Sequence, residues 1–153
     1  MREIEVDGFL ADSVAQAEGK LYVQGAGWNQ ITAPLFPAVH DRIGIGLLVR
    51  MGADGSEGRH TFELRLIGPA EEELQLGESP NGPLTRLPGE ITTGEGADHI
   101  VPIAINLNGM PLARPGDYRF VVSVDGIDRK TLPFRVLSLA AQAPPSTSVS
   151  GYL

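Results

Sequence analysis

The chain has 153 residues, no cysteine and a formal net charge of -7. This length suits a single domain with a sizeable core. The lack of cysteine excludes disulfides, thiolate metal sites and cysteine nucleophiles. The acidic charge argues against binding to nucleic acid or anionic lipid, since both select basic surfaces.

Short segments in which apolar and polar residues alternate, separated by Gly, Pro, Asn or Asp, predict an all-β fold. We expect an antiparallel immunoglobulin-like β-sandwich of seven to eight strands. Strands are predicted near residues 2–10, 20–28, 42–50, 61–67, 99–107, 117–125 and 131–137, with a weaker one near 84–92.

The first third of the chain combines a predicted helical turn, at residues 12–17, with the strand at 20–28. On that strand, Leu21 and Val23 are expected to face the core. The opposite face then presents Tyr22 and Trp28, the only tryptophan. These two aromatic side chains are candidate anchors for a partner, because buried Trp and Tyr dominate binding hot spots.

The strand at 42–50 has an apolar face formed by Ile43, Ile45, Leu47 and Val49. Gly44 and Gly46 lie on its other face. Two glycines on one face leave a groove or permit close approach of another segment. We favour the close packing.

The middle of the chain is harder to assign. The strand at 61–67 alternates regularly, and residues 70–74 predict one helical turn. Residues 77–96 hold three prolines and form the longest irregular segment, in which we expect an edge strand and a surface loop.

The strand beginning at Tyr118 is the most regular of the chain. Tyr118, Phe120, Val122 and Val124 share one face. It follows the turn at 115–117, and this layout resembles the entry to strand F of immunoglobulin-like domains, where a tyrosine holds a corner.

The domain is predicted to cover residues 1–138, followed by an extended tail at 139–153. No charged residue occurs from Val136 to Leu153. We expect this tail to act as an arm that lies on a neighbouring subunit or another protein. Its expected contacts are Leu137, Leu139, Val149, Tyr152 and Leu153.

No nucleotide-binding loop or nucleophile elbow is present in the sequence. His40, His60 and His99 each lie beside a turn or a strand start, without the spacing of a metal site. We therefore predict no cofactor and no metal. An enzyme in which the three histidines converge on Asp41 or Asp98 remains a third hypothesis.

Two motifs resemble an uncharacterised bacterial family of small immunoglobulin-like β-sandwich proteins. One is Phe9-Leu10-Ala11-Asp12 with the Gly-Lys-Leu and Gly-Ala-Gly-Trp segments that end at Trp28. The other is Pro115-Gly116-Asp117-Tyr118-Arg119-Phe120 with Val124-Asp125-Gly126. Ala26 replaces a glycine of the pattern. The resemblance covers the chain up to about Val136 and implies a fold but no activity.

The first hypothesis is a non-enzymatic structural or interaction module, a subunit of a larger assembly such as a phage capsid decoration or minor virion protein. Its partner would be another protein or a second copy, not nucleic acid or membrane. The alternative is a β-sandwich that binds a small ligand or carbohydrate at the Trp28 end. The charged, strand-like start lacks the features of a signal peptide, so a cytoplasmic location, with incorporation into a particle, is expected.

Overall fold

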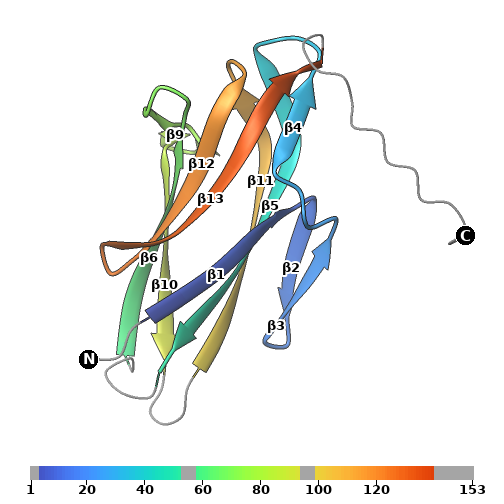
Figure 1. Ribbon diagram of the computed structural model, residues 1–153. Helices are drawn as coiled ribbons and strands as arrows, with labels where there is room; N and C mark the ends of the chain where they lie inside the picture. The colour runs from blue at the N-terminus through green and yellow to red at the C-terminus, as the bar shows by residue number, and fades with distance from the viewer. Residues whose placement is uncertain (1–3, 53–57, 94–98, 140–153) are drawn as a thin grey trace, which may run out of the picture.

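The computed structural model describes residues 4–52, 58–93 and 99–139. Two β-sheets pack against each other (Figure 1). The first has the order β1 (Ile4–Ala11), β5 (Ala38–Met51), β11 (His99–Leu112). The second has the order β10 (Arg86–Thr93), β6 (Gly58–Ile67), β12 (Gly116–Val124), β13 (Ile127–Ser138), β4 (Gln30–Ala33).

Short strands complete the architecture. The strand β7 (Glu73–Leu74) pairs with β6. Two hairpins form separate small sheets, β2 (Ser13–Ala17) with β3 (Lys20–Gln24), and β8 (Gly77–Ser79) with β9 (Gly82–Leu84). The β2–β3 hairpin stands beside β1 and β5 (Figure 1).

The connectivity is that of an immunoglobulin-like sandwich. The order β1-β5-β11 matches strands A, B and E of that fold, and β6-β12-β13 matches strands C, F and G. All pairs within the two sheets are antiparallel except β13 with β4, which is parallel. The predicted fold class is therefore confirmed.

The core forms where the predicted alternation places it. Ile43, Ile45, Leu47 and Val49 are completely buried, as are Phe120 and Val122 of the facing sheet. The ring of Phe134 stacks on Tyr118 and Phe120, with 5.4 Å between ring centroids in each pair. Burial of these side chains supplies the main driving force for joining the two sheets.

The two glycines of β5 allow close packing, as expected. A Cβ atom at Gly46 would lie 2.4 Å from the ring of Phe9, which faces it from β1. A Cβ atom at Gly44 would lie 3.1 Å from the backbone of Ser13. Both positions are therefore occupied by neighbouring atoms and leave no groove.

A tyrosine corner fixes the start of β12. Tyr118 is only 3% exposed, and its hydroxyl donates a hydrogen bond of 2.6 Å to the backbone carbonyl of Arg114. The bond runs four residues back along the chain, as in the corner of immunoglobulin-like domains. It holds the turn at 114–117 against the sheet that follows.

Both predicted helical turns are wrong. Residues 13–17 form β2, and residues 70–74 form a turn followed by β7. Tertiary hydrogen bonds override local preference in β2, since the peptide groups of Val14 bond to the side chain of Asn106. The segment 77–96 is also more regular than expected, because it contains β8, β9 and β10.

The expectation that Leu21 and Val23 face the core is wrong. Leu21 is half-buried, while Val23 is 39% exposed. The hairpin that carries them lies outside the sandwich, so neither of its faces lies between the two sheets. The strand also ends at Gln24 rather than continuing to Trp28.

We predict that Tyr118→Phe lowers the free energy of unfolding by about 0.5–1.5 kcal/mol, because the hydrogen bond to the carbonyl of Arg114 is lost. The phenylalanine ring preserves the stacking on Phe134. Urea denaturation at equilibrium measures the difference. Tyr22→Phe, at a tyrosine that is 51% exposed, is the control and should leave the midpoint nearly unchanged.

Candidate functional site

The two aromatic side chains predicted as anchors lie in different environments. Tyr22 is 51% exposed on the β2–β3 hairpin. Trp28 is half-buried and packs against the core, and its ring lies 6.3 Å from the ring of His40. Gly25 and Gly27, with φ of +66° and +98°, turn the chain between them. Only Tyr22 presents most of its ring to a partner.

The predicted arm begins at the end of β13. Leu137 is half-buried and pairs with Thr32 of β4, and Leu139 is 53% exposed. Val149, Tyr152 and Leu153 lie outside the described residues.

The three histidines do not converge. His40 lies near the start of β5, whereas His99 pairs with Met51 at the other end of that strand. His60 lies on β6, in the other sheet. Among residues 4–52, 58–93 and 99–139 no group of three or more His, Cys, Asp or Glu side chains could hold a metal ion. The hypothesis of a three-histidine centre is therefore wrong.

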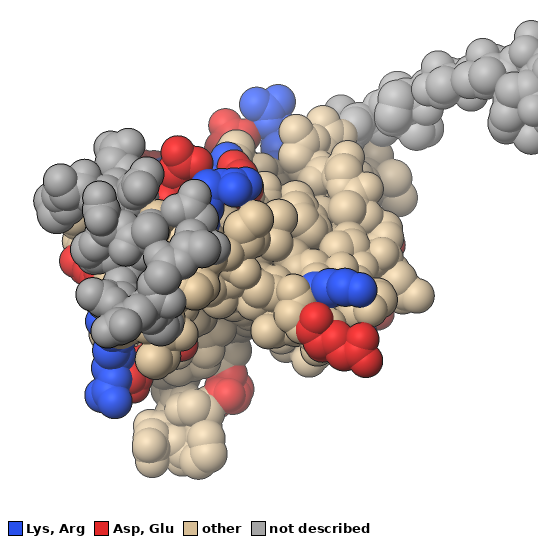
Figure 2. Space-filling model, turned by 90° about the horizontal axis from the view of Figure 1, so that it is seen from below, with Lys and Arg blue, Asp and Glu red and all other residues tan. Residues whose placement is uncertain are grey.

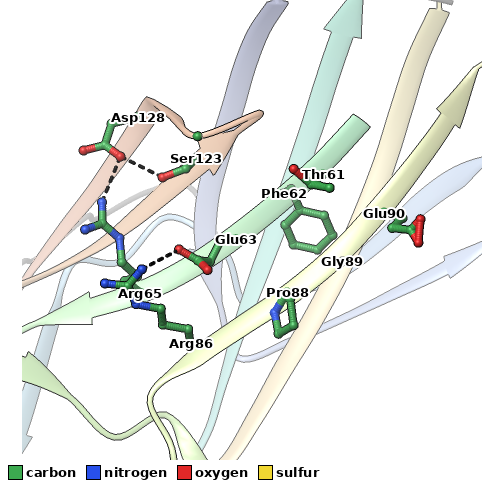
Figure 3. A pocket seen from close by; sticks show the side chains of 11 residues that line it. Thr61, Phe62, Glu63, Arg65, Arg86, Pro88, Gly89, Glu90, Ser123 and Asp128 are labelled. Atoms are coloured by element: carbon green, nitrogen blue, oxygen red, sulfur yellow. Dashed lines mark hydrogen bonds and ion pairs between the residues drawn. The ribbon is translucent and has the colours of Figure 1, made fainter. Parts of the chain in front are cut away.

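A hollow of about 730 Å³ lies on the outer face of β10, β6 and β12 and reaches the turn before β13 (Figure 3). On β10, the ring of Phe62 lies over Gly89, where an added Cβ atom would be only 2.0 Å from it. The charged residues that line the hollow are Glu63, Arg65, Arg86, Glu90 and Asp128, and the polar ones include Thr61 and Ser123. We call this hollow the polar groove.

The charges of the polar groove neutralise one another. Arg86 donates to both oxygens of Glu73, at 2.6 and 3.0 Å, and to Glu63 at 3.1 Å. Asp128 accepts hydrogen bonds from Arg65 at 2.8 Å and from Ser123 at 2.7 Å, as the dashed lines in Figure 3 show.

These contacts lower the pKa of Asp128 in the groove and of Glu73 beside it. The hydrogen bond from Arg86 lowers the pKa of Glu73, and the hydrogen bond from Ser123 and the charge of Arg65 lower the pKa of Asp128. Glu90 pairs with Arg59, 3.3 Å away. A carboxylate held ionised by its partners is poorly suited to donate a proton as a general acid near neutral pH.

A histidine–aspartate pair closes one end of the same sheet. His60, 8% exposed, lies with its Nδ1 atom 2.7 Å from Oδ2 of Asp125. The other oxygen of Asp125 accepts a hydrogen bond from the backbone N–H of Thr61 at 3.0 Å. The hydrogen bond with His60 is the largest cause of the lowered pKa of Asp125. From the sequence, Asp41 and Asp98 were the predicted partners of the histidines. The pair of His60 with Asp125 was missed because only the fold brings β6 next to the turn after β12.

The outer face of the first sheet is apolar at its centre. The register places Phe9, Gly46 and Ala104 in one row, and Leu48 and Pro102 in the next, where the exposed Asp7 lies beside Leu48. Leu48 is 37% exposed and Ile100, one row further, is 51% exposed. We call Phe9, Leu48, Ile100, Pro102 and Ala104 the apolar face. Seen from below, charged side chains form separate groups with a broad uncharged area between them (Figure 2).

The β2–β3 hairpin is fastened at one end of the apolar face by the side chain of Asn106. Its Oδ1 accepts a hydrogen bond from the N–H of Val14 at 3.0 Å, and its Nδ2 donates one to the carbonyl of Val14 at 2.8 Å. This side-chain amide thus bonds to β2 as the backbone of a neighbouring strand would. Val14 is 3% exposed, and Arg42 adds a longer hydrogen bond of 3.4 Å to Ser13.

Comparison with known families gives the chain a family. A family model matches residues 7–137, and its description is a family of unknown function, DUF6941. The chain belongs to this family. No curated protein matches the sequence. The described residues of this family member contain no helix that is long and apolar enough to cross a membrane.

Three solved structures are similar in fold. One is the Pseudomonas fluorescens alkylpurine DNA glycosylase AlkC bound to DNA, with 11% identity, a TM-score of 0.46 and coverage of 88% of this chain and 30% of that one. Another is a Listeria innocua β-glucosidase in complex with isofagomine, with 9% identity, a TM-score of 0.49 and coverage of 89% and 16%. An immunoglobulin-like protein of Pseudomonas aeruginosa has 13% identity, a TM-score of 0.42 and coverage of 88% and 96%.

This DUF6941 chain spans less than a third of the glycosylase and of the glucosidase. All three TM-scores are below 0.5, and we infer nothing about its activity from these proteins.

We predict that Asp125→Asn destabilises the protein at neutral pH and that the difference from the unmodified protein shrinks in acid. The pKa of Asp125 is lowered in the folded state, so ionised Asp125 stabilises the fold above its ordinary value of 3.8. This contribution is lost as the pH falls through the lowered pKa. Asparagine accepts the positive φ of 52° at this position.

Urea denaturation at a series of pH values, from neutral to below 3.8, measures this convergence. Asp7→Asn, at an exposed position on β1, is the control. A constant difference between Asp125→Asn and the unmodified protein at every pH would contradict the assignment.

We also predict that Asn106→Ala loosens the β2–β3 hairpin, because two hydrogen bonds to Val14 are lost at a cost of about 1–3 kcal/mol. Amide hydrogen exchange at Val14 should accelerate while exchange in β12 stays slow. Asn108→Ala is the matched control, since Asn108 accepts a hydrogen bond from Arg42 and none from β2. Equal exchange rates at Val14 in both variants would count against the clamp.

Proposed function

We propose that this protein is a non-enzymatic interaction module, a subunit of a larger assembly that docks through its C-terminal arm. The observation that carries this proposal is the apolar face. A solvated outer face of an antiparallel sheet normally carries polar side chains. Here the segment from Ile43 to Val49 on β5 contains no polar side chain at all. A strand of this kind fits a sheet that is covered on both sides.

The composition of the arm supports the same proposal. Leu139, where the described chain ends, is 53% exposed. From there to Leu153 no residue is charged, and Val149 and Tyr152 supply apolar side chains near the end. An arm without charges can be buried on another protein surface without the large penalty of desolvating an ion.

Catalysis has less support in the polar groove. Each charged side chain that lines it belongs to an ion pair within the sheet. Ligand binding at the Trp28 end also has less support, because the Trp28 ring packs against the core and presents little flat surface for stacking.

A virion is one assembly that the proposal covers. Capsid decoration or a minor structural role would suit a small, acidic, cysteine-free chain whose arm reaches a neighbour. The properties that support it are general ones, shared by many subunits, so the first experiment concerns assembly itself.

We predict that the full chain forms assemblies with masses that are multiples of 16.3 kDa and that a chain ending at Leu139 is a monomer. Light scattering after size-exclusion chromatography measures both masses. The reason is the loss of the arm's apolar contacts. If both chains are monomers, or if both assemble equally, docking through the arm is refuted. Matching thermal melting of the two chains serves as the control for folding.

A further inference from the structure

We infer that the apolar face receives the C-terminal segment, residues 140–153, of a second copy of this chain. The inference rests on the proposed function and deepens it, because it names the surface that the arm contacts. The strand β5 lies at the centre of its sheet, with β1 and β11 on either side.

The side of β5 that faces away from the core is covered only in part. Ser13 lies over Gly44, and the ring of Phe9 lies over Gly46. Beyond these two positions, Leu48 and the neighbouring Ile100 remain 37% and 51% exposed. Charged side chains border this area, since Asp7 lies beside Leu48, and the ion pair of Glu5 with Arg50 lies in the row of Ile100. An apolar area within a charged rim is typical of a surface that binds another segment.

The hairpin extends the apolar area. Val14 and Val23 are partners across β2 and β3 and therefore share one face of the hairpin. Val14 is buried against the domain, whereas Val23 is 39% exposed on that same face. Leu21, on this face as well, is half-buried. A segment lying along Leu48 would thus meet further aliphatic side chains from the hairpin.

The C-terminal segment matches this surface in chemistry and length. Its 14 residues carry no charged side chain, and its last five include Val149, Tyr152 and Leu153. Fully extended, 14 residues span about 46–50 Å, at about 3.3–3.6 Å per residue. The stretch before Val149 contains Ala, Pro, Ser and Thr, which suit a spacer between the domain and the apolar side chains.

The position of β13 favours a second copy over the chain's own face. The strand ends at Ser138, beside Ala33 of β4, in the sheet that packs against the inner side of β1-β5-β11. The apolar face points away from that sheet. A segment from its own chain would have to pass around the edge of the sandwich, whereas a segment from a neighbour approaches directly. Such head-to-tail contacts generate rings or filaments, as expected of an assembly subunit.

The test uses the full chain with single substitutions on the apolar face. Leu48→Asp and Ile100→Asp place a charge where the segment would lie, and assembly should weaken at least tenfold in each. Ile127→Asp is the matched control, because Ile127 is 55% exposed but lies at the start of β13, in the other sheet and away from the face. Light scattering over a concentration series gives the masses, and circular dichroism confirms that each variant folds.

A second measurement identifies the occupant. A peptide of residues 140–153 is added to the isotopically labelled chain that ends at Leu139. When the peptide binds, we expect the NMR chemical shifts of Phe9, Leu48, Ile100 and Val23 to change. In the Leu48→Asp variant these changes should be absent.

The outcomes are distinguishable. If truncation at Leu139 abolishes assembly but both aspartate variants assemble normally, the arm acts elsewhere and only the named surface is wrong. If the aspartate variants are monomers while the truncated chain still assembles, the face joins copies without the arm and the occupant is wrong. If the full chain is a monomer and its own arm covers the apolar face, the claim that the arm comes from a second copy is wrong. If no variant changes the mass, both proposals fail.

Discussion

The structure depends on one strand that is apolar on both sides. β5 pairs with β11 along most of its length and with β1 from Gly44 to Met51, so it fixes the register of the first sheet. From Ile43 to Met51 its inward side chains are completely buried against the facing sheet. At the centre of the strand, its outward positions are Gly44 and Gly46, which bring Ser13 and Phe9 close, and Leu48. Near-continuous apolar runs of this kind occur where a sheet is covered on both faces.

The outer face of the second sheet differs from that of the first because it carries charged side chains. β6 alternates buried apolar residues with polar ones, and two of the polar ones, Glu63 and Arg65, have charged partners on β10 and β13. Exposed ion pairs of this type contribute little stability each. These ion pairs keep charged side chains on this face, in contact with water. This contrast between the two outer faces, within one domain, is the reason that we propose the apolar face as a binding surface.

The sequence predicted those parts of the fold whose pattern is local. Alternation identified the inward faces of β5 and β12, and the turn before Tyr118 predicted its corner. The hairpin of β2 and β3 was missed because its strand conformation depends on Asn106, which lies 92 positions from Val14. Trp28 does not continue the strand, because Gly25 and Gly27 adopt positive φ and turn the chain before it. The alternation of apolar and polar residues does not predict such a turn. The His60–Asp125 pair joins residues 65 positions apart and required the fold.

The net charge of the chain supports the proposal that an arm without charged side chains joins its copies. Each copy carries a formal charge of -7, so two copies repel each other over distances of about one Debye length, about 8 Å at physiological ionic strength. Broad contact between two charged domain surfaces would add to that repulsion. An extended arm keeps the domains apart while its own uncharged residues reach an uncharged area of the neighbour. The attraction is then short-ranged and apolar, and the acidic surfaces remain in water, where their repulsion limits unspecific association.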